Sequence, residues 1–126
     1  MREIKFRAFV KDTKKMFPVH SLEFSSLEEQ PVEVSGCGNV DCGTCTDFYE
    51  LEQVELMQYT GTKDKNDVEI YEKDYVRFGG IIALVVWSDK YCQFRLDDGT
   101  ATISLNIHHK SDYEVIGNIC ENPELL

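Results

Sequence analysis

Residues 57–78, MQYTGTKDKNDVEIYEKDYVRF, contain the pattern that decides the fold. An alternating run ends at the polar stretch that begins with Thr60-Gly61, and short β-rich runs follow at residues 68–71 and 75–78. The tight turn Glu72-Lys73-Asp74 separates these two runs. Apolar and polar residues that alternate between turn residues are typical of antiparallel strands with short connections. The segment therefore predicts the entrance to a small antiparallel barrel.

The rest of the C-terminal half continues this pattern. Gly79-Gly80 is a strong hairpin signal, and Ile81–Trp87 is apolar throughout, which predicts a strand buried on both faces. The other strands predicted from alternation are Tyr91–Leu96, Ala101–Ile107 and Tyr113–Ile119. Because turn signals recur roughly every 8–12 residues, residues 54–126 are predicted to form an all-β barrel or sandwich.

The N-terminal part, residues 1–53, predicts a smaller β lobe. Residues 3–9 alternate and Met16–Val19 resumes a strand, so the two form a hairpin, and Pro18 places the second strand at a sheet edge. At most one helical turn is expected within residues 21–30. Residues 31–47 predict an inserted Cys/Gly-rich loop. The fold class is therefore mainly β with little helix.

One segment between the two parts remains ambiguous. Residues 49–59 alternate as a strand would, but a helix through residues 48–56 fits the sequence about as well. Phe48, Leu51 and Glu55 follow the helical period. Both interpretations stay open at this level.

Composition restricts the classes of partner. The chain has 126 residues and a formal net charge of −10, from 23 acidic and 13 basic residues, which argues against nucleic acid or an anionic membrane as partner. The sequence contains neither an apolar run of about 20 residues nor a signal-peptide core, so we expect a cytoplasmic protein. Basic residues gather in residues 2–15 and acidic ones in residues 23–55. This asymmetry predicts either a contact between subunits or an unevenly charged solvated surface.

The five cysteines carry the sharpest chemical signal. Cys37, Cys42 and Cys45 have the C-x4-C-x2-C spacing of a plant-type ferredoxin loop, and thiolates so spaced can converge on one metal ion. Reduced thiols without a cofactor are the simpler interpretation, zinc is the alternative, and an iron–sulfur cluster is the third. Candidates for a fourth ligand are Cys92, Cys120, His20, His108 and His109. Cys92 and Cys120 are otherwise interpreted as small buried hydrophobic residues.

Other residues with chemical potential have simpler structural roles. The sequence has no P-loop, nucleophile elbow or His-Glu-x-x-His motif, so no catalytic residue is predicted. Asp97-Asp98 before a glycine is interpreted as a turn. Aromatic rows of small barrels can bind peptides or nucleic acid. In the aromatic-rich C-terminal half, Trp87 is expected in the core or at its rim, and Tyr71 and Tyr75 are better candidates for exposure.

Three blocks of the chain resemble the YopX family of phage and prophage proteins. They are residues 1–16 (MREIKFRAFVKDTKKM), residues 57–78 and residues 113–126 (YEVIGNICENPELL). The resemblance implies a β-rich phage-type protein with an SH3-like barrel in its C-terminal half and no established catalytic activity. Asp67 and Lys73 stand where the family pattern has glycine, at positions suited to φ > 0. Lys73 is therefore expected to change the turn type or to carry modest strain.

Together these features predict a phage- or prophage-derived protein that is not an enzyme and acts through protein contacts. A homo-oligomer is expected, from the charge asymmetry and from edge strands that need covering, and a host or phage protein is a possible further partner. Three alternatives remain: a nucleic-acid-binding module using the basic hairpin, an acidic decoy of a host nucleic-acid-binding protein, and a zinc module at the cysteine loop.

Overall fold

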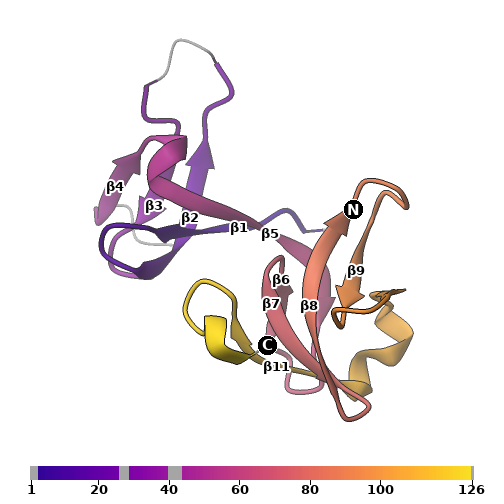
Figure 1. The fold of residues 1–126 in the computed structure, drawn as a ribbon. Helices are drawn as coiled ribbons and strands as arrows, with labels where there is room; N and C mark the ends of the chain where they lie inside the picture. The colour runs from indigo at the N-terminus through magenta and orange to yellow at the C-terminus, as the bar shows by residue number, and fades with distance from the viewer. Residues whose placement is uncertain (1–2, 26–28, 40–43, 126) are drawn as a thin grey trace. The chain divides into compact units, whose positions relative to one another are not determined.

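In the computed structural model of the protein, residues 3–25, 29–39 and 44–125 are described, except for the side chains of Ile107 and His108. The chain divides into two compact units, Lys5–Gln58 and Met1–Ile4 with Tyr59–Leu126, called here the N-terminal and C-terminal units. The strands form two antiparallel sheets, which confirms the mainly β class (Figure 1). None of the helices in the described ranges has the length and apolarity needed to cross a bilayer.

The first sheet has the strand order β4-β3-β2-β1-β5-β6. Its strands are β1 (Phe6–Val10), β2 (Lys15–Leu22), β3 (Val32–Ser35), β4 (Thr46–Tyr49), β5 (Val54–Lys63) and β6 (Glu69–Tyr71). Strand β5 belongs to both units: its first half pairs with β1, and its second half pairs with β6. The two units divide between Gln58 and Tyr59, within β5, whereas the sequence predicted a boundary at residues 53/54.

The core of the N-terminal unit lies on one face of these strands. Ala8 and Val10 of β1 alternate inward and meet Val32 and Val34 of β3, and each of the four is nearly inaccessible to solvent. Val54, at the start of β5, completes the cluster. The sequence predicted the β1–β2 hairpin because every second residue of β1 is apolar.

Two predictions for this unit are wrong. Strand β2 is internal rather than at an edge, since it pairs with both β1 and β3. The proline is tolerated because the β3 pairing begins only at Val19, so Pro18 lies just outside that ladder. Residues 31–47 are also not wholly a loop: Val32–Ser35 forms β3, which the short Val-Glu-Val alternation could have indicated.

The ambiguous segment contains both kinds of structure. Strand β4 ends at Tyr49, a single 3-10 turn, η1, covers Leu51–Gln53, and β5 follows directly. Glu50 and Gln53 close a capping box around this turn, in which the Glu50 backbone N–H donates to Gln53 Oε1 at 2.8 Å. The helical turn predicted within residues 21–30 falls partly on residues 26–28, which lie outside the described residues.

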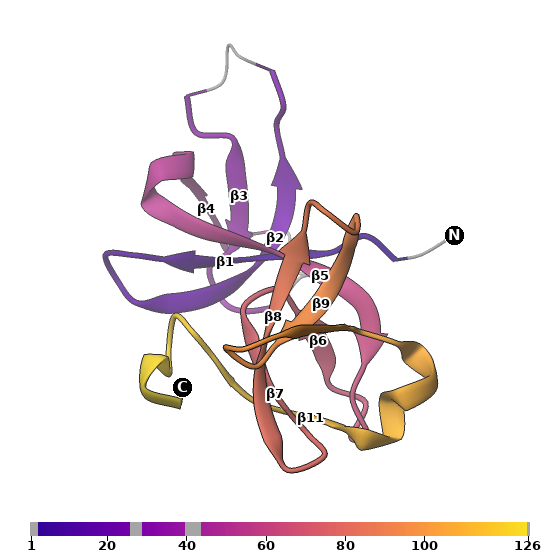
Figure 2. The ribbon, with the colours of Figure 1, turned by 45° about the vertical axis from the view of Figure 1, so that its right-hand side comes forward.

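The second sheet, in the C-terminal unit, has the order β10-β9-β8-β7-β11 (Figure 2). Its strands are β7 (Asp74–Phe78), β8 (Ile81–Ser88), β9 (Gln93–Asp97), β10 (Thr102–Ser104) and β11 (Tyr113–Asn118). Two 3-10 segments complete the unit, η2 (Ile107–Asp112) between β10 and β11 and η3 (Pro123–Leu125) after β11. Its buried cluster comprises Ile70, Val76, Ala83, Val85, Phe94, Leu96 and Tyr113.

Two strands of this sheet differ from their predictions. In β8 only Ala83 and Val85 are fully buried, so the strand is buried on one face and partly exposed on the other. A continuous apolar run cannot separate these cases, because the side chains on the second face are apolar too. Strand β10 is limited to Thr102–Ser104, and the chain then turns into η2. The Gly79-Gly80 hairpin is confirmed, with φ angles of 58° and 85°.

The turn between β6 and β7 places Lys73 in the left-handed region, with φ = 67°, as expected for a position suited to positive φ. Because a non-glycine residue pays about 1–2 kcal/mol there, Lys73→Gly should raise the free energy of unfolding by about 1 kcal/mol. Lys73→Ala is the matched control, since alanine keeps the backbone penalty and removes the side chain. Urea unfolding of the two variants measures the difference. An alanine variant as stable as the glycine variant would show that the side chain, not the backbone, carries the cost.

Gly117 lies at a register shift between β11 and β7, where the C-terminal residues pass close to the strand. A Cβ at this position would lie 2.7 Å from Asn122 Oδ1 and 2.9 Å from Leu125 Cδ1. Gly117→Ala should therefore lower the free energy of unfolding by about 1–3 kcal/mol. The double variant with Asn122→Ala removes the nearest atom and should recover part of the loss, which a double-mutant cycle measures. If the two substitutions change the free energy of unfolding additively, the loss in Gly117→Ala does not come from a clash with Asn122.

Candidate functional site

The cysteine loop connects β3 to β4. Cys37 and Cys45 line one shallow pocket of about 280 Å³, together with Gly36, Thr44, Thr46 and Asp47. The loop is closed at its base because the Gly36 N–H donates to the Cys45 carbonyl at 2.6 Å. Cys37 Sγ lies 3.6 Å from the hydroxyl of Ser35, which is itself fully buried. Two of the three predicted metal ligands therefore share a pocket.

The predicted metal site is incomplete within the described residues. Cys42, its third thiol, lies outside them. Across the part of the chain that the structure describes, no group of three His, Cys, Asp or Glu side chains is placed to hold a metal ion. Of the proposed fourth ligands, His20 has a buried Nε2 with no hydrogen-bond partner among the described atoms. The interpretation of Cys92 as a buried residue is wrong: it is exposed in a turn with φ = 51°, and Cys120 is half-buried.

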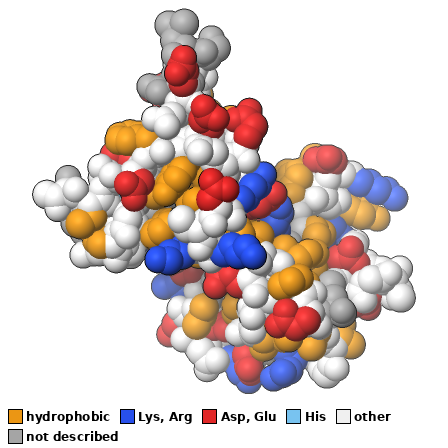
Figure 3. Space-filling view, turned by 60° about the vertical axis from the view of Figure 1, so that its left-hand side comes forward, with side chains coloured by type: hydrophobic (Ala, Val, Ile, Leu, Met, Phe, Trp, Pro, Cys, Tyr) orange, Lys and Arg blue, Asp and Glu red, His pale blue; other side chains and the backbone are white. Residues whose placement is uncertain are grey.

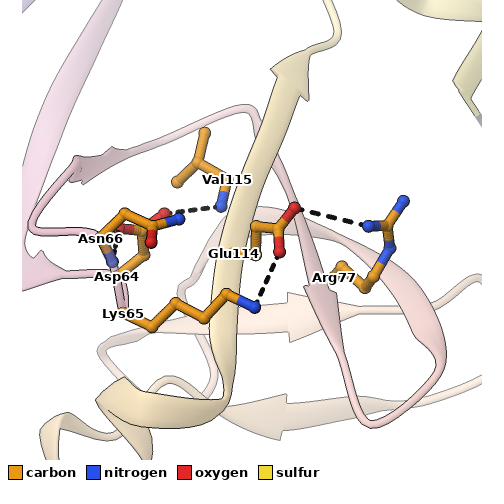
Figure 4. A network of polar contacts seen from close by, with 6 residues as sticks. All are labelled: Asp64, Lys65, Asn66, Arg77, Glu114 and Val115. Carbon is orange, nitrogen blue, oxygen red and sulfur yellow. Dashed lines mark hydrogen bonds and ion pairs between the residues drawn. The ribbon is translucent and has the colours of Figure 1, made fainter.

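Asp64 is a buried carboxylate of the C-terminal unit, and both of its oxygens accept backbone N–H groups (Figure 4). Its side chain is fully buried, and Oδ1 accepts the backbone N–H groups of Asn66 and Val68 at 2.8 and 2.9 Å. Oδ2 accepts the N–H of Val115 at 2.9 Å. Asp64 thereby joins the loop after β5 to β11, and β11 in turn pairs with β7. All three hydrogen bonds are accepted from backbone N–H groups, so Asp64 is a structural residue.

Glu114, on β11, is surrounded by cations (Figure 4). Lys65 Nζ lies 2.9 Å from one carboxylate oxygen and Arg77 Nη1 lies 3.4 Å from the other. The hydrogen bond and charge of Lys65, with a smaller contribution from Arg77, hold the pKa of Glu114 below its usual value. The three side chains are partly exposed, so they form a surface ion-pair network rather than a catalytic group.

Exposed hydrophobic residues alone do not mark a site on this protein. Figure 3 shows hydrophobic, acidic and basic side chains mixed over the face that it presents. Single exposed apolar residues are normal in soluble proteins. A more informative feature is an exposed aromatic side chain that specific contacts hold in one position, because large rigid side chains with low entropy cost are typical of binding hot spots.

The β8–β9 hairpin carries two such aromatic residues. Trp87 is 47% exposed, yet its ring packs edge-on against Phe94 at 5.1 Å between centroids. Its indole N–H also donates to Asp89 Oδ1 at 3.0 Å. Tyr91, in the turn, is 51% exposed and lies 4.1 Å below the guanidinium of Arg95. Because Trp87 pairs with Phe94 and Val86 pairs with Arg95, Trp87 and the Tyr91–Arg95 stack lie on opposite faces of the hairpin. We call Lys90, Tyr91 and Arg95 the hairpin surface.

Arg95 is held from several sides. Its Nε–H donates to the Thr102 hydroxyl at 2.9 Å and its Nη2 to the Thr102 carbonyl at 3.0 Å. Its Nη1 donates to Gln93 Oε1 at 2.6 Å and to the Ser104 hydroxyl at 3.3 Å. Since these residues belong to β9 and β10, the sheet fixes the plane of the guanidinium and with it the position of the Tyr91 ring.

The sequence located this surface only in part. Trp87, expected in the core or at its rim, is 47% exposed and contacts the buried Phe94. Tyr75 is 1% exposed, so its predicted exposure is wrong, and Tyr71 is half-buried. The prediction that Tyr75 is exposed is wrong because Tyr75 lies on a strand that is buried on both faces at that point. The signal that could have indicated Tyr91 is its place in a polar turn, next to Lys90 and four residues before Arg95.

Comparisons with known proteins agree with this architecture. The crystal structure of protein EF1440 from Enterococcus faecalis is similar, with a TM-score of 0.68 and 26% sequence identity, over 100% of this chain and 99% of that chain. The comparison with curated proteins finds no match. The family model described as YopX protein matches residues 5–126. Because that match spans nearly the whole chain, the protein belongs to the YopX family.

Proposed function

We propose that this YopX-family chain is a non-enzymatic protein-binding module, of phage or prophage origin, that acts in the cytoplasm through its hairpin surface. The observation that carries the proposal is that Tyr91 is 51% exposed and yet held against the guanidinium of Arg95, which hydrogen bonds fix to β9 and β10. Ordering an exposed aromatic residue contributes little to folding, but it lowers the entropy cost of a later contact. An SH3-like barrel in the C-terminal unit would present the hairpin as a rigid edge.

A non-enzymatic role is supported by the hydrogen bonds of Asp64 and Asp98, which both accept backbone N–H groups. Asp64 accepts three backbone N–H groups. Asp98 accepts the N–H groups of Thr100 and Ala101, and these bonds hold its pKa below the usual range. Carboxylates engaged in this way stabilise turns and are not positioned as general acids or bases.

Photo-crosslinking in the cells that express the protein tests the proposal. A photo-reactive phenylalanine analogue replaces Tyr91, and the crosslinked protein is identified with and without Arg95→Ser. We expect one discrete protein partner that is lost in the Arg95→Ser variant. Phe48→Ser in a chain with the same probe is the matched control, since Phe48 is 52% exposed in the N-terminal unit and should leave capture unchanged. Equal capture by the probe chain and by both serine variants would overturn the proposal. No capture by any of the three would also overturn it.

Self-association is a further part of the proposal. The basic β1–β2 turn and the acidic residues of the same unit support it through charge. Strand β2, which contains Pro18, is paired on both sides and needs no cover, whereas β10 lies at a sheet edge. Size-exclusion chromatography with light scattering should give a mass above the 14.5 kDa of one chain. A monomer at both low and high salt would contradict it.

Zinc binding is the second candidate function. The observation that favours it is the pocket shared by Cys37 and Cys45. Elemental analysis of protein purified without chelator should give about one zinc per chain, and Cys45→Ser should remove it. Protein free of zinc after incubation with the metal would end this hypothesis.

A further inference from the structure

Strand β10 ends the second sheet, and within the described residues one of its edges has no partner strand. It pairs with β9 alone, and its three residues are exposed. Two hydrogen bonds just outside the strand show which of its backbone groups face β9. The Leu105 N–H donates to the Phe94 carbonyl, and the Asp98 N–H donates to the Ala101 carbonyl.

In an antiparallel ladder every second residue turns both its N–H and its carbonyl toward the neighbouring strand. Since Leu105 and Ala101 have this orientation, Ile103 has it too, and the backbone groups of Thr102 and Ser104 point to the free edge. Among the described residues only one of these four groups has a partner. The Thr102 carbonyl accepts Arg95 Nη2 at 3.0 Å, and its second lone pair stays open. The edge therefore offers two donors and two acceptors to another strand.

The other outer strands of the two sheets are protected against such pairing. The open side of β11 is covered by the loop after β5, because Asp64 accepts the Val115 N–H and the Lys65 N–H donates to the Tyr113 carbonyl. In β6 one N–H is taken by a carboxylate of the turn that follows. Strand β4 carries the charged Asp47, and charges on an edge strand oppose pairing. Strand β10, with the sequence Thr-Ile-Ser, has neither charge nor proline.

The free edge of β10 is complementary to itself. If two copies pair antiparallel with Thr102 opposite Ser104, both residues exchange backbone hydrogen bonds with the other copy. Ile103 then lies opposite Ile103 of the second copy, in the kind of pair whose side chains approach most closely. Ile103 is 43% exposed and shares a face with the buried Leu96, its partner on β9, so the contact extends the apolar face of the sheet. No two charged side chains are opposite each other in this register.

We infer that β10 pairs with β10 of a second copy, antiparallel and centred on Ile103, so that the second sheets of two chains become one continuous sheet. This inference rests on the proposed self-association and names its surface. A foreign strand could use the same backbone groups, but the symmetric pairing also covers each exposed Ile103 with an identical apolar side chain. Because β10 is short, we expect a reversible dimer with a dissociation constant of about 10–100 µM.

The dependence on salt separates this contact from self-association through charge. Each chain has a formal net charge of −10, so two copies repel, and the β10 contact contains no ion pair that salt would weaken. Sedimentation equilibrium of the full chain should therefore show a dimer that added salt strengthens. A dimer that forms only at low salt would overturn the β10 contact and leave charge-driven association standing. A monomer up to about 0.5 mM chain at both low and high salt would overturn both.

Opposite charges at residue 103 test the register. Ile103→Lys and Ile103→Glu should each weaken the dimer at least about tenfold, because like charges would meet at its centre. A 1:1 mixture of the two variants should recover the dimer, since opposite charges then face each other. Ile81→Lys is the matched control: Ile81 is 41% exposed on β8, and its change should leave the affinity as it was. Failure of the mixture to recover the dimer, with both variants folded by circular dichroism, would refute the register.

Proline at the free edge tests the backbone hydrogen bonds. Thr102→Pro removes an N–H that points away from β9, so the dimer should be lost while the sheet remains folded. Thr102→Ala loses the same hydroxyl but keeps the N–H, and it should still dimerise. Unchanged affinity in Thr102→Pro would place the interface elsewhere and refute the inference. A wild-type monomer that captures a foreign protein, with capture lost in Thr102→Pro, would assign the edge to a foreign strand and refute it as well.

Discussion

Asp64→Ala should lower the free energy of unfolding by about 3–5 kcal/mol. The Asp64 carboxylate is fully buried and accepts the N–H groups of Asn66, Val68 and Val115. Alanine leaves these three donors without their acceptor, and a buried unsatisfied donor costs about 1–3 kcal/mol. Urea unfolding at neutral pH measures the total. Amide hydrogen exchange should also become faster at Val68 and Val115, because both N–H groups lose their partner.

A pair of carboxylate-to-amide changes separates burial from charge. Asp64→Asn keeps the shape of the side chain but turns one acceptor into a donor, so it should still cost about 1–3 kcal/mol. Asp67→Asn makes the same change three residues later, where the side chain is exposed and pairs with Lys110 at 2.6 Å. The Asp67 variant should change stability by at most about 0.5 kcal/mol. Similar losses in both variants would show that Asp64 acts through its charge and not through its backbone hydrogen bonds.

Tyr113→Ala should cost about 3–5 kcal/mol, the usual range for removing a large buried ring. Tyr113 is 1% exposed, its ring packs against Phe78 at 5.2 Å, and its hydroxyl oxygen accepts the Asn106 N–H at 3.0 Å. Tyr113→Phe keeps the ring and should cost only about 1 kcal/mol, since it loses that one hydrogen bond. Tyr91→Ala, at an exposed tyrosine, is the control and should be nearly neutral. Equal losses for alanine and phenylalanine at residue 113 would contradict a packing role.

The same residue predicts how stability depends on pH. Burial raises the pKa of the Tyr113 phenol, Asp112 adds to this, and the hydrogen bond from Asn106 partly opposes it. A group with a raised pKa in the folded state binds its proton more tightly there than in the unfolded chain. Its contribution is therefore complete below a pH of about 10, and is lost as the pH rises through the folded-state pKa. Tyr113→Phe should flatten the stability profile above that pH, which chemical unfolding at several alkaline pH values measures.

The segments that carried the family resemblance have mainly structural roles. Asp64 joins the loop after β5 to β11, and Asp74 Oδ2 accepts the Tyr71 N–H at 2.8 Å in the turn before β7. Asn118 accepts the Glu121 N–H at 2.9 Å, which shapes the turn that follows β11. Residues 57–78 thus identify the family and shape the fold, whereas the hairpin surface lies further along the chain.

The sequence by itself determined the β class, the hairpins and the special turns. Alternation indicated the strands because a sheet has a period of two, and the Gly79-Gly80 turn followed from the freedom of glycine at positive φ. The left-handed Lys73 was expected only from the family resemblance, because backbone sterics disfavour lysine there. Alternation and turn conformation depend on residues that are adjacent in the chain, so the sequence alone can predict them.

Only the tertiary structure decided which faces are buried and which side chains meet. Tyr75 and Tyr91 are the same residue type in similar runs, but one is buried and the other exposed, because neighbouring strands cover only the first. The contacts of Arg95 with Thr102 and Ser104, and of Asp64 with Val115, join residues that are far apart in the sequence or on different strands. Such contacts depend on strand order and register, which no local pattern specifies.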